Sequence, residues 1–158
     1  MSLGASIVGM HYRYPDHYEV EWEKIREYAI AVKNDDPEFF EEKAAAELGY
    51  HGLVAPLTFI SVFGYKAVSA FFEAAGIATN ESQIVQVDQK LDFLRPIKVG
   101  DRLYCDVSVE SVRRAHGTDI IMTRQTVTNE AGEVVQETYT TLAGRAGEGG
   151  EGFEDVTA

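Results

Sequence analysis

Cysteine and positive charge are both scarce in this sequence. Its 158 residues include one cysteine, Cys105, so the chain has neither a disulfide framework nor a Cys-rich zinc site. We therefore expect a reducing, cytoplasmic environment, and the start of the chain shows no basic stretch followed by an apolar one, so no secretory signal is predicted. Lys and Arg number 14 against 26 Asp and Glu, which gives a formal net charge of −12. Because a phosphate-binding surface needs clustered positive charge, nucleic acid is not expected as a partner.

Motifs for cofactors and metals are also missing. The sequence contains no Gly-rich phosphate loop, no dinucleotide fingerprint and no metal-spaced His/Cys cluster, so we expect no cofactor and no metal ion. What it does contain is 45% hydrophobic and 11% aromatic residues, enough to bury the core of one domain. We expect that domain to span residues 1–144, and the Gly- and Glu-rich residues 145–158 to form a mobile acidic tail.

The first half of the chain has helical periodicity. Apolar side chains spaced three and four residues apart predict an amphipathic helix over Glu21–Val32. A second helix is predicted over Glu38–Leu48, with Asp36 as its N-cap, Pro37 as its first residue and Gly49 as its C-cap.

The most apolar segment runs from Pro56 to about Ala75. Its bulky side chains are spread almost all round a helical wheel, which predicts a helix buried on most sides. Lys66 and Glu73 lie within it and Gly76 closes it, so no membrane span is expected.

The period changes to strict alternation after Gln83. Cys105 alternates with polar neighbours in step with Leu103 and Val107, so we expect its thiol to face the core and to be unreactive. The predicted strands are Ile84–Phe93, a strand around Leu103–Val109, Ile120–Thr128 and Val134–Gly144. Helices followed by an antiparallel meander indicate the α+β class, with a sheet wrapped around the long buried helix.

Two segments carry a resemblance to a known family. Phe93–Leu103 (FLRPIKVGDRL) and Gly49–Pro56 (GYHGLVAP) resemble the hot-dog fold of the MaoC-like (R)-specific hydratase/dehydratase superfamily. Across nearly the whole chain, the sequence is most similar to the A-type subunits of heterodimeric (3R)-hydroxyacyl-acyl-carrier-protein dehydratases from mycobacteria and actinobacteria. The resemblance implies dehydration of a 3-hydroxyacyl thioester in fatty acid and mycolic acid elongation. It implies as partners a catalytic B-type hot-dog subunit, an acyl carrier protein and a long-chain acyl thioester.

The acid/base pair of that superfamily is missing here. Its members carry an Asp and a His in a Gly-Asp-x-Asn-Pro-x-His pattern, and alignment on Pro37 places the Asp on Asn34 and the His on Phe39. A carboxamide does not titrate near pH 7, and a phenyl ring has no exchangeable proton. The resemblance therefore implies a substrate-binding subunit whose partner carries the catalytic pair.

Two other readings stay open. Asp35 or Asp36 with His51 would make a self-sufficient enoyl hydratase or thioesterase with a relocated site, although turn, cap and solvated-loop roles explain these three residues more simply. The chain would otherwise be a non-catalytic acyl-binding module.

Candidate substrate contacts follow from the long helix and from the basic residues. The backbone N–H of Leu57 lies at the helix start, where the macrodipole favours a partially negative oxygen. Four aromatic side chains of the same segment either line an acyl tunnel or belong to the core: Phe59, Phe63, Phe71 and Phe72. Three basic residues either dock the acidic carrier protein or are solvated strand ends: Arg95, Lys98 and Arg102.

Overall fold

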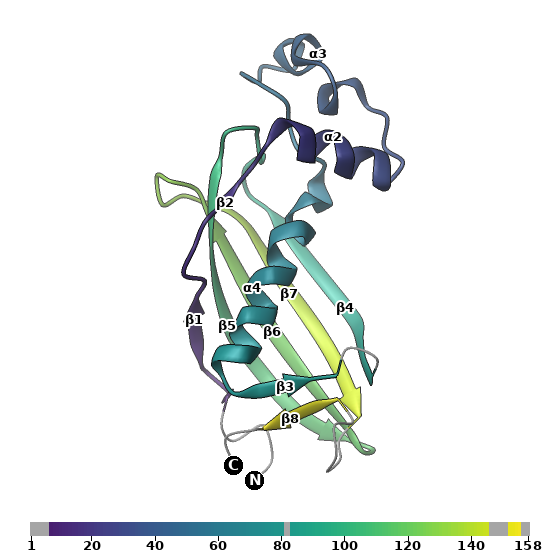
Figure 1. The fold of residues 1–158 in the computed structure, drawn as a ribbon, viewed down its shortest axis with the longest axis vertical. Helices are drawn as coiled ribbons and strands as arrows, with labels where there is room; N and C mark the ends of the chain where they lie inside the picture. The colour runs from purple at the N-terminus through teal and green to yellow at the C-terminus, as the bar shows by residue number, and fades with distance from the viewer. Residues whose placement is uncertain (1–6, 81–82, 146–151, 156–158) are drawn as a thin grey trace.

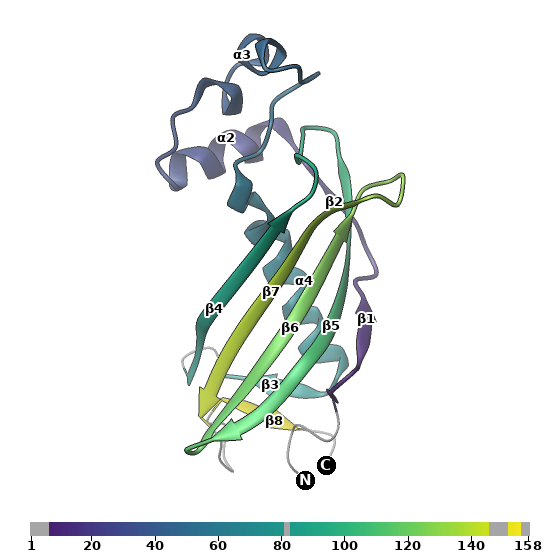
Figure 2. The ribbon, with the colours of Figure 1, turned by 180° about the vertical axis from the view of Figure 1, so that it is seen from behind.

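The computed structural model describes residues 7–80, 83–145 and 152–155. Its main element is a curved antiparallel sheet in which the strands follow the order β1-β5-β6-β7-β4, with β2 also pairing with β5 (Figures 1 and 2). The bounds are β1 His11–Arg13, β2 Tyr18–Glu19, β4 Ile84–Phe93, β5 Arg102–Ala115, β6 Thr118–Thr128 and β7 Val134–Arg145. The predicted antiparallel sheet is confirmed, and β5, β6 and β7 form a meander, whereas β4 pairs with β7 and not with β5, the strand that follows it in the sequence.

One long helix crosses the concave face of this sheet. A 3₁₀ turn, η2 (Leu57–Ile60), continues into α4 (Ser61–Ala74), and the sheet curves around it (Figure 1). The α+β prediction of a sheet wrapped around a helix is confirmed. Pro56 precedes η2 as its N-cap, so the first helical residue is Leu57.

The burial of α4 is one-sided. Phe63 and Phe71 are each 1% exposed, whereas Tyr65 is 63% exposed. The Phe63 ring packs against Tyr14 and Tyr18 with centroids 5.5 Å apart, so the N-terminal segment covers this side of the helix. The prediction of burial on most sides is wrong within this chain, because the sheet and the N-terminal segment enclose only part of the helix.

The same helix meets the length and composition requirements of a membrane span. Leu57–Ala74 has 18 residues and a mean hydropathy of 1.2. Phe63, Phe71 and Phe72 of this helix nevertheless pack into the core, and 33% of the segment is buried in the described structure.

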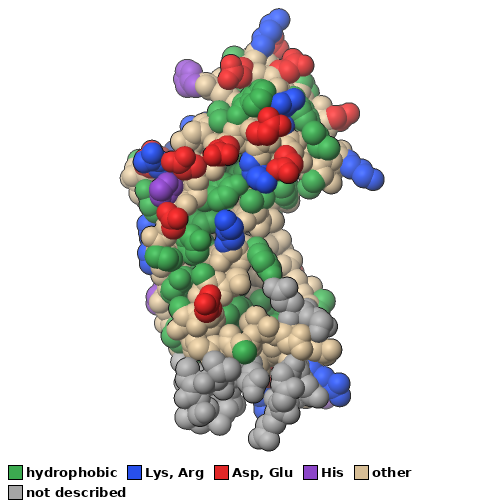
Figure 3. All heavy atoms as spheres, viewed as in Figure 1, with side chains coloured by type: hydrophobic (Ala, Val, Ile, Leu, Met, Phe, Trp, Pro, Cys, Tyr) green, Lys and Arg blue, Asp and Glu red, His purple; other side chains and the backbone are tan. Residues whose placement is uncertain are grey.

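A smaller helical region lies beyond one end of the sheet. It contains α2 (Trp22–Ala31), the 3₁₀ turn η1 (Pro37–Phe39) and α3 (Glu42–Glu47) (Figure 1). Figure 3 shows acidic and basic side chains interspersed over this region. The acidity here is therefore divided by positive charges rather than being a field of one sign.

The second predicted helix is broken in two. Glu41 is extended, with φ −128° and ψ 122°, and separates η1 from α3. The break allows the ring of Phe39 to turn into the core while Glu41 stays exposed. Asp36 is the N-cap of η1 and Pro37 its first residue, as predicted, but the Asp36 side chain makes no capping hydrogen bond. Gly49 does end α3: it has φ +91°, a conformation that only glycine adopts without strain.

The C-terminal segment contributes a strand. β8 (Phe153–Asp155) pairs with β3 (Ile77–Thr79), which directly follows α4, and the two lie across the end of that helix (Figure 1). Of the predicted mobile tail, residues 146–151 and 156–158 lie outside the described residues. Residues 152–155 belong to the fold, because the apolar ring of Phe153 is buried to 5% exposure.

Candidate substrate-binding site

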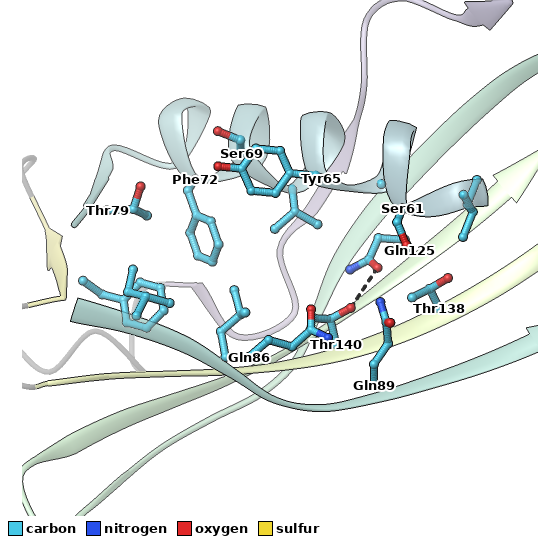
Figure 4. Close-up of a pocket in the computed structure, with 16 residues that line it drawn as sticks. Ser61, Tyr65, Ser69, Phe72, Thr79, Gln86, Gln89, Gln125, Thr138 and Thr140 are labelled. Atoms are coloured by element: carbon cyan, nitrogen blue, oxygen red, sulfur yellow. Dashed lines mark hydrogen bonds between the residues drawn. The ribbon is translucent and has the colours of Figure 1, made fainter. Parts of the chain in front are cut away.

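A cavity of about 590 Å³ lies between α4 and the inner face of the sheet (Figure 4). This volume is within the range of small-ligand sites. The helix forms one wall, and strands β4, β6 and β7 form the other. The residues that line it are Ile60, Ser61, Gly64, Tyr65, Val68, Ser69, Phe72, Thr79, Ile84, Gln86, Gln89, Gln125, Thr138, Thr140, Leu142 and Phe153.

The two ends of the cavity differ in polarity. Near the start of α4, the labelled side chains in Figure 4 are hydroxyls and carboxamides, and we call this the polar end: Ser61, Gln89, Gln125, Thr138 and Thr140. Toward β3 and β8 lie four hydrocarbon side chains, with Thr79 and Gln86 beside them, and we call this the apolar end: Phe72, Ile84, Leu142 and Phe153. Such a cavity suits a ligand with a polar head and a hydrocarbon tail.

Hydrogen bonds organise part of the polar end. The amide Nε2 of Gln125 donates to Oγ1 of Thr123 at 2.7 Å, and Oγ1 of Thr140 donates to Oε1 of Gln125 at 3.3 Å (Figure 4). Thr138 differs from them. It is 4% exposed, and its Oγ1 has no hydrogen-bond partner among the described residues. A buried hydroxyl without a partner costs about 1–3 kcal/mol, so this group is available to a ligand.

The polarity of this end comes from two strands. On β5 the inward-facing residues, such as Leu103 and Val107, are apolar, and the prediction that Cys105 faces the core with them is confirmed. On β6 and β7 the inward positions include Thr123, Gln125, Gln136, Thr138 and Thr140, each at most 7% exposed. Sequence reasoning missed these residues. The sequence did carry a signal for them. A strand whose alternating positions are polar on both faces, although one face has to cover the core, indicates polar groups turned inward.

Cys105 has no environment for nucleophilic chemistry. It is fully buried, and desolvation raises the pKa of its thiol to about 12. The neighbouring Asp106 also raises this pKa, while Arg13 lowers it. The thiolate, which is the nucleophile, is therefore negligible near neutral pH.

The positions of the superfamily's acid/base pair lie away from the cavity lining. Asn34 sits in the turn after α2, where its Oδ1 accepts a hydrogen bond from the N–H of Asp36 at 3.1 Å. Phe39 is 8% exposed and belongs to the core cluster. Asp35, Asp36 and His51 are exposed. None of these lines the cavity, and the lining residues include no carboxylate and no histidine.

The predicted substrate contacts divide into two groups. Phe72 lines the cavity, whereas Phe59, Phe63 and Phe71 are each 1% exposed and pack into the core instead. Leu57 is 63% exposed and lies outside the lining. The helix start is anchored one residue later, because the hydroxyl of Tyr28 lies 2.9 Å from both the carbonyl oxygen and Oγ1 of Thr58.

The predicted docking residues differ in how far their charges are compensated. Arg95 pairs with Glu133 at 3.1 Å. Arg102 pairs with Glu19 at 3.0 Å and with Glu130 at 3.4 Å. Among the described residues, no ion pair involves Lys98. The positive charge of this surface is therefore carried mainly by Lys98.

In residues 7–80, 83–145 and 152–155, no three His, Cys, Asp or Glu side chains are grouped as possible metal ligands. What the described chain presents is an antiparallel sheet around a helix, with an amphipathic cavity between them. These features define an α+β protein of the hot-dog type with a cavity between helix and sheet. Residues 6–138 match the family model of the FAS1-like dehydratase domain region, and the chain belongs to this family.

Similar proteins come from mycobacteria. A UPF0336 protein of Mycobacterium tuberculosis strain H37Rv is 73% identical over 158 residues, which cover 100% of both chains. Among solved structures, the C-terminally truncated HadBC (3R)-hydroxyacyl-ACP dehydratase complex from M. tuberculosis contains a chain that is 46% identical. The match covers 90% of this chain and 100% of that one, with a TM-score of 0.81. A MaoC-like dehydratase is 38% identical over 89% of this chain but 43% of its own, with a TM-score of 0.81. The predicted hot-dog and MaoC-like dehydratase resemblance is confirmed.

Proposed function

We propose that this chain is the substrate-binding subunit of a heterodimeric (3R)-hydroxyacyl-ACP dehydratase. The enzyme converts a 3-hydroxyacyl thioester into a trans-2-enoyl thioester and water, in cytoplasmic fatty acid and mycolic acid elongation. One observation carries the proposal. A chain of the dehydratase family has an amphipathic cavity, while its acid/base positions hold Asn34 and the buried Phe39.

The cavity matches the two parts of an acyl thioester. The hydroxyl of Thr138 and the carboxamide of Gln125 offer hydrogen bonds to the oxygens of the head group. The apolar end takes the hydrocarbon tail, where each buried methylene contributes about 0.8 kcal/mol. Dehydration also requires a base for the C2 proton and an acid for the leaving hydroxyl. The lining has no carboxylate or histidine for these steps, so the partner subunit supplies them.

The edge of the sheet offers the partner a docking place. β4 ends the strand order, and its Val85 and Val87 are 59% and 56% exposed. An open strand edge carries unpaired N–H and C=O groups and readily pairs with another strand. Because β4 also lines the cavity through Gln86 and Gln89, a partner on this edge lies beside the substrate. Pairing of two hot-dog units also agrees with the HadBC relative being a complex and the MaoC-like relative having a chain more than twice as long as the shared segment.

The decisive experiment compares the chain alone with the chain co-purified with a catalytic hot-dog subunit. Hydration of a long-chain trans-2-enoyl thioester is measured for both. We expect turnover from the complex and none from this chain alone. Full activity from the isolated chain would contradict the proposal and favour the self-sufficient enzyme. Failure to form any complex would favour an acyl-binding module.

The docking edge has its own test. Val87→Asp places a charge on β4, and we expect it to abolish co-purification with the catalytic subunit. Val8→Asp is the matched control, because Val8 is 53% exposed and lies just before β1, at the opposite edge of the sheet. Equal complex formation by both variants would contradict pairing through β4.

A further inference from the structure

A residue of the C-terminal segment lines the apolar end of the cavity. Phe153 lines the cavity, and its ring centroid lies 5.5 Å from that of Phe72 on α4. The ring is 5% exposed. Two aromatic rings, one from the helix and one from β8, therefore lie side by side at the apolar end of the cavity.

Two glycines make room for this ring. A Cβ added to Gly144 on β7 would lie 2.8 Å from Cδ2 and Cε2 of Phe153. A Cβ added to Gly152 would lie 2.6 Å from the carbonyl oxygen of Arg145, and Gly152 also has φ +139°. A side chain at Gly144 would collide with the Phe153 ring. A side chain at Gly152 would collide with the backbone of Arg145. The two glycines thus leave space for the aromatic side chain of Phe153.

The position of the Phe153 ring is separate from the polar end of the cavity. β8 pairs with β3 in the register Thr79 to Phe153, and not with the strands that carry Gln125 and Thr138. Thr79 also lines the cavity. A change at residue 153 therefore alters the depth of the cavity without altering the groups that hold the head of the ligand.

We propose that Phe153 is a specificity-determining residue that sets the greatest length of acyl chain the cavity accepts. The inference rests on the proposed function, because it takes the occupant to be an acyl thioester bound with its tail toward β8. The alkyl tail runs past Ile84 and Leu142 and stops against the paired rings of Phe72 and Phe153. Removing the Phe153 ring lengthens the cavity, and enlarging the ring shortens it.

The test uses the complex with the catalytic subunit and a series of straight-chain trans-2-enoyl thioesters that lengthens by two carbons at each step. For Phe153→Ala we expect the optimum of kcat/KM to move to longer chains. The gain should be about fourfold for each further methylene that the cavity accepts, from the burial energy of a methylene group. Phe153→Trp should move the optimum to shorter chains.

The matched control is Phe63→Leu. Phe63 is a buried phenylalanine of α4, but it packs against Tyr14 and Tyr18 and does not line the cavity. It should lower thermal stability and leave the chain-length profile unchanged. If Phe153→Ala does not fold, Phe153→Leu takes its place, because it keeps an apolar side chain at this position. It should move the optimum of kcat/KM in the same direction by a smaller amount.

The outcomes separate this inference from the proposed function. A wild-type complex without activity on any chain length would overturn the proposed function. An active complex whose chain-length profile is the same for wild type, Phe153→Leu and Phe153→Trp would overturn the role of Phe153 alone. Opposite shifts for the smaller and larger side chains would support it.

Discussion

The carboxamide of Gln125 donates a 2.7 Å hydrogen bond to the hydroxyl of Thr123 on the inner face of β6. Thr140 completes this group by donating to the other side of the same carboxamide. Thr138, two residues away on β7, is equally buried but has no partner among the described residues. The polar end therefore holds satisfied groups beside an unsatisfied one, and substitutions at these threonines should have opposite effects.

Thr138→Val removes the unpaired hydroxyl while keeping the shape of the side chain. We expect the free energy of unfolding to stay the same or to rise by up to about 1 kcal/mol, because the wild-type hydroxyl is buried without a hydrogen bond. The KM for the acyl thioester should rise about fivefold if that hydroxyl binds the head group. Urea unfolding and steady-state kinetics of the complex measure the two quantities.

Thr123→Val is the matched control. It deletes the acceptor of the Gln125 amide, so we expect the free energy of unfolding to fall by about 1–3 kcal/mol. Thr123 does not line the cavity, and KM should change little. Equal losses of stability in Thr123→Val and Thr138→Val would contradict this account of the polar end.

Gly64 leaves space on the cavity side of α4. A Cβ added there meets no atom within 4 Å. Gly64→Ala should therefore raise the free energy of unfolding by about 0.5–1 kcal/mol, because glycine is a poor residue inside a helix. Gly64→Leu should also fold, but its side chain should fill part of the cavity. Because several methylenes of a long acyl chain would then not be buried, kcat/KM for such chains should fall more than tenfold. Unchanged long-chain kinetics in a folded Gly64→Leu variant would show that substrate does not pass this point.

Among the three residues predicted to dock the carrier protein, Lys98 is the one for which the described residues supply no ion pair. We expect Lys98→Glu to lower kcat/KM for an acyl-ACP substrate about tenfold at low ionic strength, and the effect should fade at high salt. The same variant should act normally on an acyl-pantetheine thioester, which lacks the acidic protein. Arg95→Ala should have a smaller effect, because Glu133 already neutralises Arg95. Equal losses on both substrates would argue against carrier-protein docking here.

The raised pKa of Cys105 predicts that stability falls with rising pH in the alkaline range. Its pKa is raised from 9.0 to about 12 in the folded chain. Well below pH 9 the thiol is protonated in both states and adds no pH dependence, whereas between about pH 9 and 12 only the unfolded chain ionises, so stability falls as pH rises. A Cys105→Val variant should lose less stability over this window in urea titrations. At neutral pH, a thiol reagent should label Cys105 only on unfolding, and rapid labelling of the native chain would contradict its burial.

The long strands were largely predictable because they depend on local alternation, although β5 continues to Ala115, past the predicted Leu103–Val109, and the short strands β1, β2 and β3 were not predicted. The predicted strand Ile84–Phe93 coincides with β4, and the prediction Val134–Gly144 differs from β7 by one residue. The helix break at Glu41 was not predictable, because it depends on Phe39 turning into a core built from other parts of the chain. Strand β8 was missed because three residues in a Gly- and Glu-rich tail carry no periodicity of their own.

The amino-acid sequence alone settles the α+β class, the long helix followed by the long strands, and the absence of the Asp and His at Asn34 and Phe39. These depend on residue type and on short-range periodicity. Tertiary structure alone decides that Phe72 and Phe153 line a cavity while Phe71 does not. The physical reason is that the different sides of a helix pack against different neighbouring segments. Which side meets tyrosines and which meets an open space depends on strands distant in the sequence, brought together by hydrogen bonding and burial.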